Sequence, residues 1–248
     1  MRDNFLNLEW TDPSRSIYRI MSFTRLVDFF RTQRYDLVRT EKWDDPFETY
    51  LSGATYLYKG GTISLALRQI VYGSCWTKKG ASDAMWRIYS PDKVAVRIKT
   101  TPNLLAEALD SALARKSRAK WFIGRVKYHS ERDILNRAES IATDVYNDRT
   151  DTSAARSYLF KRNAFSHEDE VRILVVDRSS RPKDGVLSLA MSPGDVIQSV
   201  LVDPRAPESV VHMYKSYLKS EFGFTRSVQQ SQIYRAPKPL VIDVTPKR

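Results

Sequence analysis

The sequence has 248 residues, of which 42% are hydrophobic, so it can bury the core of a globular domain and is neither fibrous nor intrinsically disordered. Forty Lys and Arg against 29 Asp and Glu give a formal net charge of +11, which favours polyanionic partners, nucleic acid first. One cysteine and three scattered histidines argue against a disulfide framework and against a zinc site, so we expect no resident metal.

We find no targeting, membrane-spanning or linker signal in the sequence. The start, M-R-D-N-F-L-N-L-E-W, is polar and unlike a signal peptide, and no run approaches the roughly 20 apolar residues that cross a bilayer. We therefore expect a cytoplasmic protein with no membrane partner. Without repeats or linkers, we predict a single domain over 1–248, with its core at about 17–223 and a C-terminal extension over 224–248.

Signals for strands and helices alternate along the first half of the chain. Leu26, Phe29 and Phe30 recur at helical spacing, and Gly73 would end a helix. The expected elements are strands at 17–20, 35–38, 74–76 and 94–99, and helices at 23–32, 62–71 and 82–89.

The second half continues the same mixed pattern. Thr101 before Pro102 is an N-cap with proline at the first helical position, and Ser130 caps another helix. The expected elements are helices from 102 to about 115, from 131 to about 146, at 152–162 and from Pro207 to Gly223, and strands at 121–128, 167–174, 196–202 and near 233. The whole is an α+β pattern.

The strand predicted at 167–174 reads H-E-D-E-V-R-I-L. Residues two apart share a strand face, so Glu168, Glu170 and Arg172 are expected on one side. Two carboxylates this close raise each other's pKa unless a positive group compensates, as Arg172 can. Two interpretations are open: a structural ion-pair ladder, which is commoner in proteins, or an acidic site at a cleft.

An arginine interrupts the apolar strand S-I-Y-R-I-M-S near the N-terminus. The planar fork of Arg19 suits paired phosphate oxygens, and a pyrophosphate is a natural ligand. The alternative is a surface arginine whose stem covers apolar area.

Three acids crowd the six-residue motif W-D-D-P-F-E at 43–48. Asp44, Asp45 and Glu48 either bind a metal ion or cap the turn and pair with an arginine such as Arg39. The close spacing favours the capping role, because hard-cation loops usually space their ligands more widely.

Aromatic residues surround a small serine in G-S-C-W (73–76) and in M-W-R-I-Y (85–89). Ser74 beside Trp76, with Trp86 and Tyr89 one helical turn apart, would form a flat-walled pocket for a stacked ring. Aromatic residues at such spacing are more often part of a core.

A basic stretch without any acid runs over 111–130. We predict nucleic-acid contacts there; the alternative is a solvated basic face. The candidate residues are Arg115, Lys116, Arg118 and Lys120.

Four blocks in order resemble a large bacterial and phage family catalogued as a domain of unknown function. They are I-Y-R (17–19), D-D-P-F-E (44–48), S-C-W followed by M-W-x-x-Y (74–89), and K-x-x-x-F-x-x-E-x-E-x-R (161–172). The resemblance covers roughly 17–223, and the ordered set is much more specific than any one block.

The order of arginine, serine and E-x-E also resembles the Arg-Ser-Glu pattern of ADP-ribosyltransferases. This resemblance implies two small β-sheets flanking a cleft, with peripheral helices and NAD as co-substrate. Arg19 would bind the phosphates, Ser74 would support the nicotinamide ribose, Glu170 would lie beside the bond that breaks, and Glu168 would orient the acceptor. The expected NAD pocket comprises Tyr18, Arg19, Asp45, Ser74, Trp76, Trp86, Tyr89 and Arg172.

The resemblance and the charge together predict an NAD-dependent ADP-ribosyltransferase. Its acceptor would be RNA or DNA, and it would act as a bacterial toxin or in an anti-phage defence system. An antitoxin or inhibitor protein would be its partner. Two alternatives stay open. One is a Mg²⁺-dependent nuclease using Asp44, Asp45, Glu168 and Glu170; the other is a non-catalytic nucleic-acid-binding module.

Overall fold

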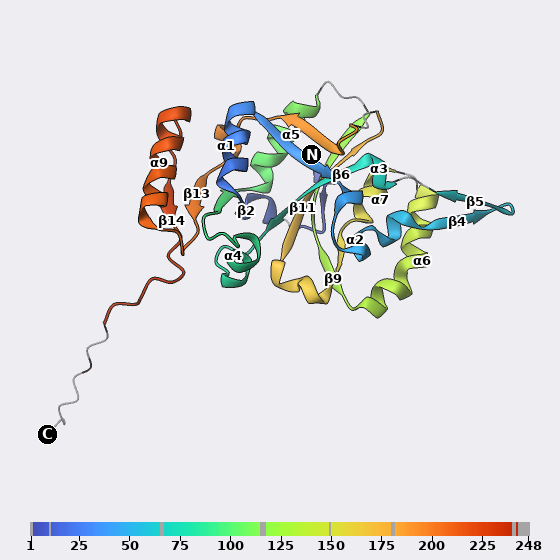
Figure 1. Ribbon diagram of the computed structural model, residues 1–248. Coiled ribbons are helices and arrows are strands. Elements are labelled where there is room, and N and C mark those ends of the chain that lie inside the picture. Colours follow the sequence, from blue (N-terminus) through green and yellow to red (C-terminus); the bar gives the residue numbers. More distant parts are fainter. Residues whose placement is uncertain are drawn as a thin grey trace.

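A large mixed sheet forms the centre of the molecule in the computed structural model (Figure 1). The structure describes residues 2–9, 11–64, 67–114, 118–148, 150–179, 182–239 and 242. In this part of the chain the main path of the sheet has the order β1-β8-β11-β6-β2-β7-β13-β14, and β3 joins β12 to β6. The bounds are β1 Phe5–Leu6, β2 Ile17–Met21, β3 Arg34–Arg39, β6 Val71–Thr77, β7 Val96–Thr100, β8 Ala119–Arg125, β11 Glu170–Asp177, β12 Val186–Ala190, β13 Ser199–Val202 and β14 Val228–Gln230.

The sheet nearly divides between β6 and β2. Among the described residues these strands share a single register pair, Tyr18 with Thr77, whereas β11 pairs with β6 along its length, from Glu170 opposite Thr77 to Val176 opposite Val71. The two halves are therefore two small sheets joined at one point. This confirms the predicted α+β fold with two small sheets beside a cleft.

Helices cover both faces of the sheet, as Figure 1 shows, with α1, α5 and α9 toward one end and α2, α3, α6 and α7 toward the other. Their bounds are α1 Phe23–Thr32, α2 Pro46–Tyr50, α3 Leu67–Ile70, α4 Asp83–Tyr89, α5 Pro102–Leu113, α6 Glu131–Asp148, α7 Asp151–Arg156, α8 Pro193–Val196 and α9 Glu208–Phe222. Short 3₁₀ helices are η1 Arg2–Asn4, η2 Asp12–Ser14, η3 Thr40–Lys42, η4 Leu51–Gly53 and η5 Asn163–Glu168. No helix of the described residues has the length and apolar content to cross a bilayer.

Local end signals explain the helices that the sequence predicted well. Ser22 accepts a hydrogen bond from the backbone N–H of Arg25 at 3.2 Å, and Thr101 accepts one from Leu104 at 3.3 Å. Gly223 ends α9 with a φ of 60°, in the left-handed region that glycine adopts without strain.

The helix predicted over 62–71 is confirmed only in part, because α3 covers Leu67–Ile70 while residues 61–64 form a strand. Lys59 and Gly60, with φ of 49° and 77°, instead turn the chain between β4 (Thr55–Tyr58) and β5 (Gly61–Ser64), a separate two-stranded sheet that projects from the body in Figure 1. Gly73 lies inside β6, where a Cβ would come within 2.5 Å of the ring of Trp43. Its small size serves close packing, not a helix end.

Other predicted boundaries also moved. The helix predicted over 152–162 ends at Arg156, and the chain then forms β10 (Phe160–Arg162), which pairs with β9 (Lys127–His129). The strand predicted over 167–174 begins only at Glu170, because Asp169 has a φ of 42° and turns the chain after η5. The strand predicted over 121–128 is divided into β8 and β9, and the strand predicted over 196–202 begins at Ser199. The final strand is β14, a few residues before the predicted position near 233. Strand β12 was not predicted.

Two apolar clusters pack against opposite faces of the sheet. Along β11, Val171, Ile173 and Val175 join the larger cluster, while Leu174 and Val176 join the smaller one. Both faces of β11 are therefore buried beyond its first residues. Strands β1 and β14 also belong to the sheet, so the folded body reaches past the predicted core limits of 17 and 223 on both sides.

Candidate functional site

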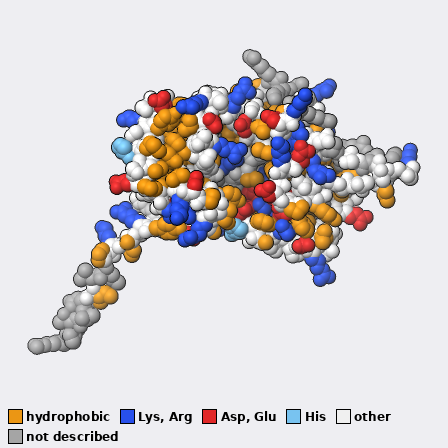
Figure 2. Space-filling view, viewed as in Figure 1, with side chains coloured by type: hydrophobic (Ala, Val, Ile, Leu, Met, Phe, Trp, Pro, Cys, Tyr) orange, Lys and Arg blue, Asp and Glu red, His pale blue; other side chains and the backbone are white. Residues whose placement is uncertain are grey.

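A cavity of about 580 Å³ opens where the two halves of the sheet separate. Tyr18 and Arg19 of β2 line it from one half, and Ser74 and Trp76 of β6 line it from the other. In Figure 2, basic and acidic side chains gather at the centre of the visible face, over these strands. The cavity therefore lies where the pairing of neighbouring strands is reduced to one register pair.

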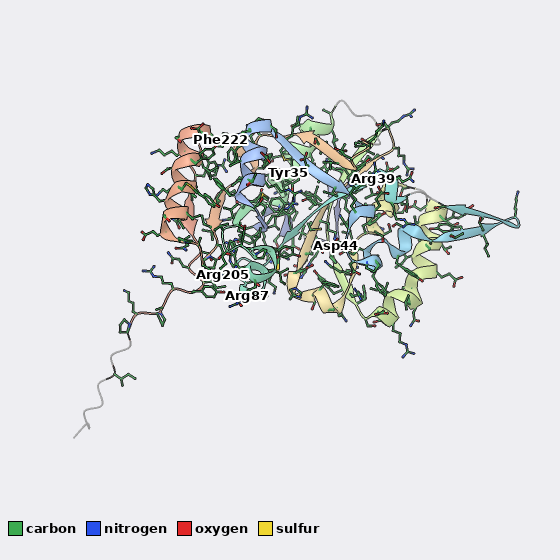
Figure 3. The ribbon with its side chains drawn as sticks, viewed as in Figure 1. Tyr35, Arg39, Asp44, Arg87, Arg205 and Phe222 are labelled. Atoms are coloured by element: carbon green, nitrogen blue, oxygen red, sulfur yellow. The ribbon has the colours of Figure 1, made fainter. Side chains whose placement is uncertain are left out.

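A hydrogen-bonded group that we call the Arg19 network comprises Arg19, Ser74 and Trp76, which line one wall, and Tyr35, which is buried behind them. Arg19 Nη1 donates to Tyr35 Oη at 2.6 Å and to Ser74 Oγ at 2.5 Å, and these two hydroxyls lie 2.5 Å apart. Trp76 Nε1 donates to Tyr35 Oη at 3.1 Å. Figure 3 shows Tyr35 near the centre of the molecule.

Counting protons gives this network a direction. Tyr35 Oη accepts from Arg19 and Trp76, so its own proton is donated to Ser74. Ser74 Oγ then accepts from Arg19 and Tyr35, which leaves its proton for a group in the cavity. Ser74 is thus set up to donate to an oxygen of a ligand.

On the opposite side lie five charged side chains that we call the buried charge cluster: Glu48, Lys161, Glu168 and Glu170, which line the cavity, and Arg172 behind them. Arg172 is fully buried and binds Glu170 with two nitrogens, Nε to Oε1 at 3.0 Å and Nη2 to Oε2 at 2.9 Å. Its Nη2 also reaches Glu48 at 2.6 Å, and its Nη1 donates to the carbonyl of Tyr158 at 2.6 Å. The indole of Trp43 covers the guanidinium at 4.5 Å.

Lys161 joins the three carboxylates of this cluster. Its Nζ lies 2.6 Å from Glu168 Oε2, 3.0 Å from Glu48 Oε1 and 3.5 Å from Glu170 Oε2. The other oxygen of Glu168 accepts from Tyr89 Oη at 2.8 Å. Sequence reasoning assigned no role to Lys161 and considered Glu48 only as a metal-binding or turn-capping acid that pairs with an arginine. Their signals were present in the K-x-x-x-F-x-x-E-x-E-x-R and D-D-P-F-E blocks.

The cluster carries three carboxylates against two cations, so it has one excess negative charge. Burial alone would raise the pKa of Glu170, but the charge and hydrogen bonds of Arg172, with the charge of Lys161, lower it to about 2. Burial lowers and the three carboxylates raise the pKa of Lys161, and the net direction is upward. Glu170 and Lys161 therefore both stay ionised at neutral pH.

The low pKa of Glu170 predicts acid sensitivity. A carboxyl group whose pKa falls from 4.5 to about 2 on folding stabilises the fold above pH 4.5 and loses that contribution as the pH falls toward 2. We expect the free energy of unfolding, measured by urea titration, to decrease over this range. The slope should be smaller in Glu170→Gln, and an equal slope in both proteins would contradict the assignment.

Most of the predicted pocket residues do meet around the cavity. They are Tyr18, Arg19, Asp45, Ser74, Trp76, Tyr89, Glu168 and Glu170. Two predicted contacts need correction. Trp86 is 1% exposed and Arg172 is 0% exposed, and neither lines the cavity, so Trp86 has no free face for stacking and Arg172 contacts the cavity residue Glu170 from behind.

The capping interpretation of the W-D-D-P-F-E motif agrees with the geometry of Asp45. Its Oδ1 accepts from the backbone N–H of Phe47 and from Arg162 Nη2, both at 3.0 Å. The paired arginine is thus Arg162, whereas Arg39 binds Glu41 at 2.7 Å. The described residues contain no group of three or more His, Cys, Asp or Glu arranged to hold a metal ion.

The predicted nucleic-acid residues lie away from the cavity where they can be placed. Arg115 and Lys116 fall outside the described residues. Lys120 pairs in register with Val176, six residues along β11 from Glu170, a separation of roughly 20 Å at the rise of a strand. Arg118, just before β8, is exposed at the same end, and Lys120 approaches Asp151 at 3.6 Å. Contacts of these residues with nucleic acid remain a prediction.

Comparisons with known proteins give one family match and several structural similarities. A family described as "Protein of unknown function (DUF2971)" matches residues 85–173, which include Tyr89 and the E-x-E segment but not the two earlier blocks. No curated protein matches the chain.

The solved structures that are similar include three complexes of DarT from Thermus sp. 2.9. The complex with ADP-ribosylated ssDNA has a TM-score of 0.43 at 11% identity, over 92% of this chain and 100% of that one. The complex with NAD⁺ has a TM-score of 0.39 at 11% identity, over 90% and 98%. The complex with carba-NAD⁺ has a TM-score of 0.37 at 12% identity, over 89% and 97%.

Proposed function

We propose that the protein is an NAD-dependent ADP-ribosyltransferase that modifies a nucleic acid, RNA or DNA. The observation that carries this proposal is the polarity of the cavity. Arg19 lines one wall, and Glu168 and Glu170, from a cluster with one excess negative charge, line the other. NAD⁺ has the matching polarity, because its nicotinamide ring is cationic and its pyrophosphate is anionic.

Glu170 is the proposed catalytic carboxylate. When the bond between nicotinamide and ribose breaks, nicotinamide leaves with the bonding electrons and positive charge develops on the sugar. A carboxylate that is already ionised and held in place stabilises this charge without reorganising. Arg172 keeps Glu170 ionised and in position, at 3.0 and 2.9 Å, and is a positioning residue.

Glu168 is the proposed acceptor-side carboxylate. It binds Tyr89, a side chain at the cavity that is 44% exposed and therefore open to an incoming group. An acceptor nitrogen or oxygen bonds to the sugar carbon that nicotinamide left, and its proton passes to Glu168. The net charge of +11 favours a polyanionic acceptor.

The remaining contacts suit the rest of the co-substrate. Ser74 donates its free proton to a ribose oxygen, and Arg19 presents its unoccupied edge to the phosphates. Tyr18, over whose ring Arg97 lies at 4.5 Å, supplies an aromatic wall. A cytoplasmic toxin or anti-phage role, with an antitoxin or inhibitor protein as partner, follows from the family resemblance and is proposed with it.

The decisive experiment follows the label of NAD. Purified protein is incubated with NAD labelled in the adenylate part, together with total RNA, DNA or protein. Transfer of label to one nucleic acid, with release of nicotinamide, is the expected result. The proposal fails if the protein neither binds NAD nor consumes it with any of these acceptors.

The nuclease alternative is less well supported by the contacts. Glu168 and Glu170 are engaged by Lys161 and Arg172, and Asp45 by Arg162. Carboxylates held this way have oxygens already bonded to cations of the protein, which a metal ion would have to displace.

Tyr35→Phe tests the Arg19 network. Losing the hydroxyl removes one acceptor of Arg19 and the donor to Ser74, so the proton of Ser74 is no longer held toward the cavity. We expect the kcat/KM for NAD to fall about tenfold, the usual effect of one hydrogen bond to a charged group. Val38→Ala, which changes a neighbouring residue of β3 that lines the cavity but makes none of these bonds, is the control. Equal effects of the two changes would contradict the role of Tyr35.

A further inference from the structure

A second arginine, Arg25, lines the same cavity as Arg19. It lies in the first turn of α1, where the cap from Ser22 fixes its backbone. The side chain of Arg25 has no hydrogen bond and no ion pair with a carboxylate in the described part of the chain. Its guanidinium is therefore available to a ligand.

Arg19 also has guanidinium nitrogens without a hydrogen-bond partner among the described residues. Its Nη1 is occupied by Tyr35 and Ser74, whereas its Nε and Nη2 have no partner among the described residues. This Nε/Nη2 edge is the one that binds two oxygens of a phosphate side by side. Arg19 is thus held by one nitrogen with its binding edge free.

The position of Arg25 is electrostatically unfavourable in the absence of a ligand. Although the residue is exposed, desolvation lowers its pKa first, and the nearby charge of Arg19 lowers it further. A cation in the first turn of a helix also opposes the positive end of the helix dipole. Asp36 attracts Arg25 weakly, and its carboxylate is bonded to Ser188. An anion between the two arginines would relieve this repulsion.

We propose that Arg19 and Arg25 together form a pyrophosphate site, in which Arg25 supplies the second cation. Two arginines match the two phosphates of a dinucleotide, so the site favours a pyrophosphate-bearing ligand over a mononucleotide or a nucleoside. This inference rests on the proposed function for the identity of the ligand as NAD. The anion site itself can be tested without any enzymatic activity.

The test measures binding by titration calorimetry at constant ionic strength. The probes are inorganic pyrophosphate, ADP-ribose and nicotinamide riboside, which carries no phosphate. In Arg25→Ala we expect the affinity for pyrophosphate and ADP-ribose to fall about tenfold or more, with Arg25→Lys intermediate and nicotinamide riboside unaffected. The matched control is Arg31→Ala, in the last turn of the same helix, where Arg31 binds Tyr217 at 2.6 Å and does not line the cavity.

A second readout separates binding from folding. Because Arg25 is repelled in the ligand-free protein, Arg25→Ala should unfold at the same temperature as the wild type or at a higher one, while losing most of the stabilisation that ADP-ribose provides. Unchanged binding of both pyrophosphate and ADP-ribose, or an equal loss in Arg31→Ala, would overturn the inference.

The two proposals fail in different ways. If the wild type binds pyrophosphate through Arg25 but never consumes NAD, the anion site stands and the proposed function falls. If NAD is consumed and Arg25→Ala leaves the KM for NAD unchanged, the proposed function is supported and the proposed role of Arg25 is contradicted.

Discussion

Glu170→Gln should abolish most NAD cleavage while leaving NAD bound. We expect kcat to fall by about 10²- to 10³-fold, the range observed when a preorganised electrostatic group is removed from an active site. The reason is that the amide keeps the shape of the side chain but removes the charge that faces the developing positive sugar. Release of labelled nicotinamide at saturating NAD measures the effect.

Glu168→Gln is the informative comparison for this change. Glu168 belongs to the same cluster and contacts Lys161 and Tyr89, but its proposed role lies on the acceptor side. We expect this variant to keep slow hydrolysis of NAD and to lose transfer to the acceptor. Circular dichroism and thermal unfolding establish that both variants are folded. If Glu170→Gln cleaves NAD at the wild-type rate, Glu170 is not the catalytic carboxylate.

Arg172→Met should give the largest loss of stability. Removing the fully buried guanidinium leaves Glu170 and Glu48 in the protein interior without their main partner. Breaking a buried ion pair from one side costs about 3 to 5 kcal/mol. We expect a decrease of this size in the free energy of unfolding, measured by urea titration at pH 7.

A matched surface change and a double variant complete this experiment. Arg178 binds Asp151 at 2.9 Å but is 46% exposed, so Arg178→Met should cost no more than about 1 kcal/mol. Adding Glu170→Gln to Arg172→Met should recover part of the lost stability, because one unpaired charge disappears. If the double variant is less stable than Arg172→Met, uncompensated charge is not the cause of the loss.

The sequence predicted an element well where the residues that fix its ends and its buried face all lie within one short segment. Helix α1 begins and ends at the predicted residues, since Ser22 caps it and apolar side chains recur on one face. The helix predicted over 62–71 is helical only at Leu67–Ile70, and Gly73, taken as the signal for its end, lies inside β6. Its small size is instead required by the ring of Trp43, far away in the sequence.

In the candidate site, too, local sequence features were predicted correctly and contacts between distant segments were not. Arg19, Ser74 and the E-x-E carboxylates were identified from residue type and order, and the structure brings all of them to one cavity. The spacing argument placed Glu168 on a strand with Glu170, which is wrong, because Asp169 turns the chain between them. The two carboxylates meet through Lys161 and not through a shared strand face.

The sequence by itself determined the mixed fold class, the capped helices, the excess of positive charge and several of the polar residues that line the cavity, because these depend on composition and on neighbours along the chain. Only the tertiary structure decided where the sheet divides, that Glu48 and Lys161 complete the buried charge cluster, that Trp86 is buried in the interior, and that Arg25 lines the same cavity as Arg19. These features arise from contacts between segments that are distant in sequence, and the free energy of a buried charge depends on the partners that folding brings to it.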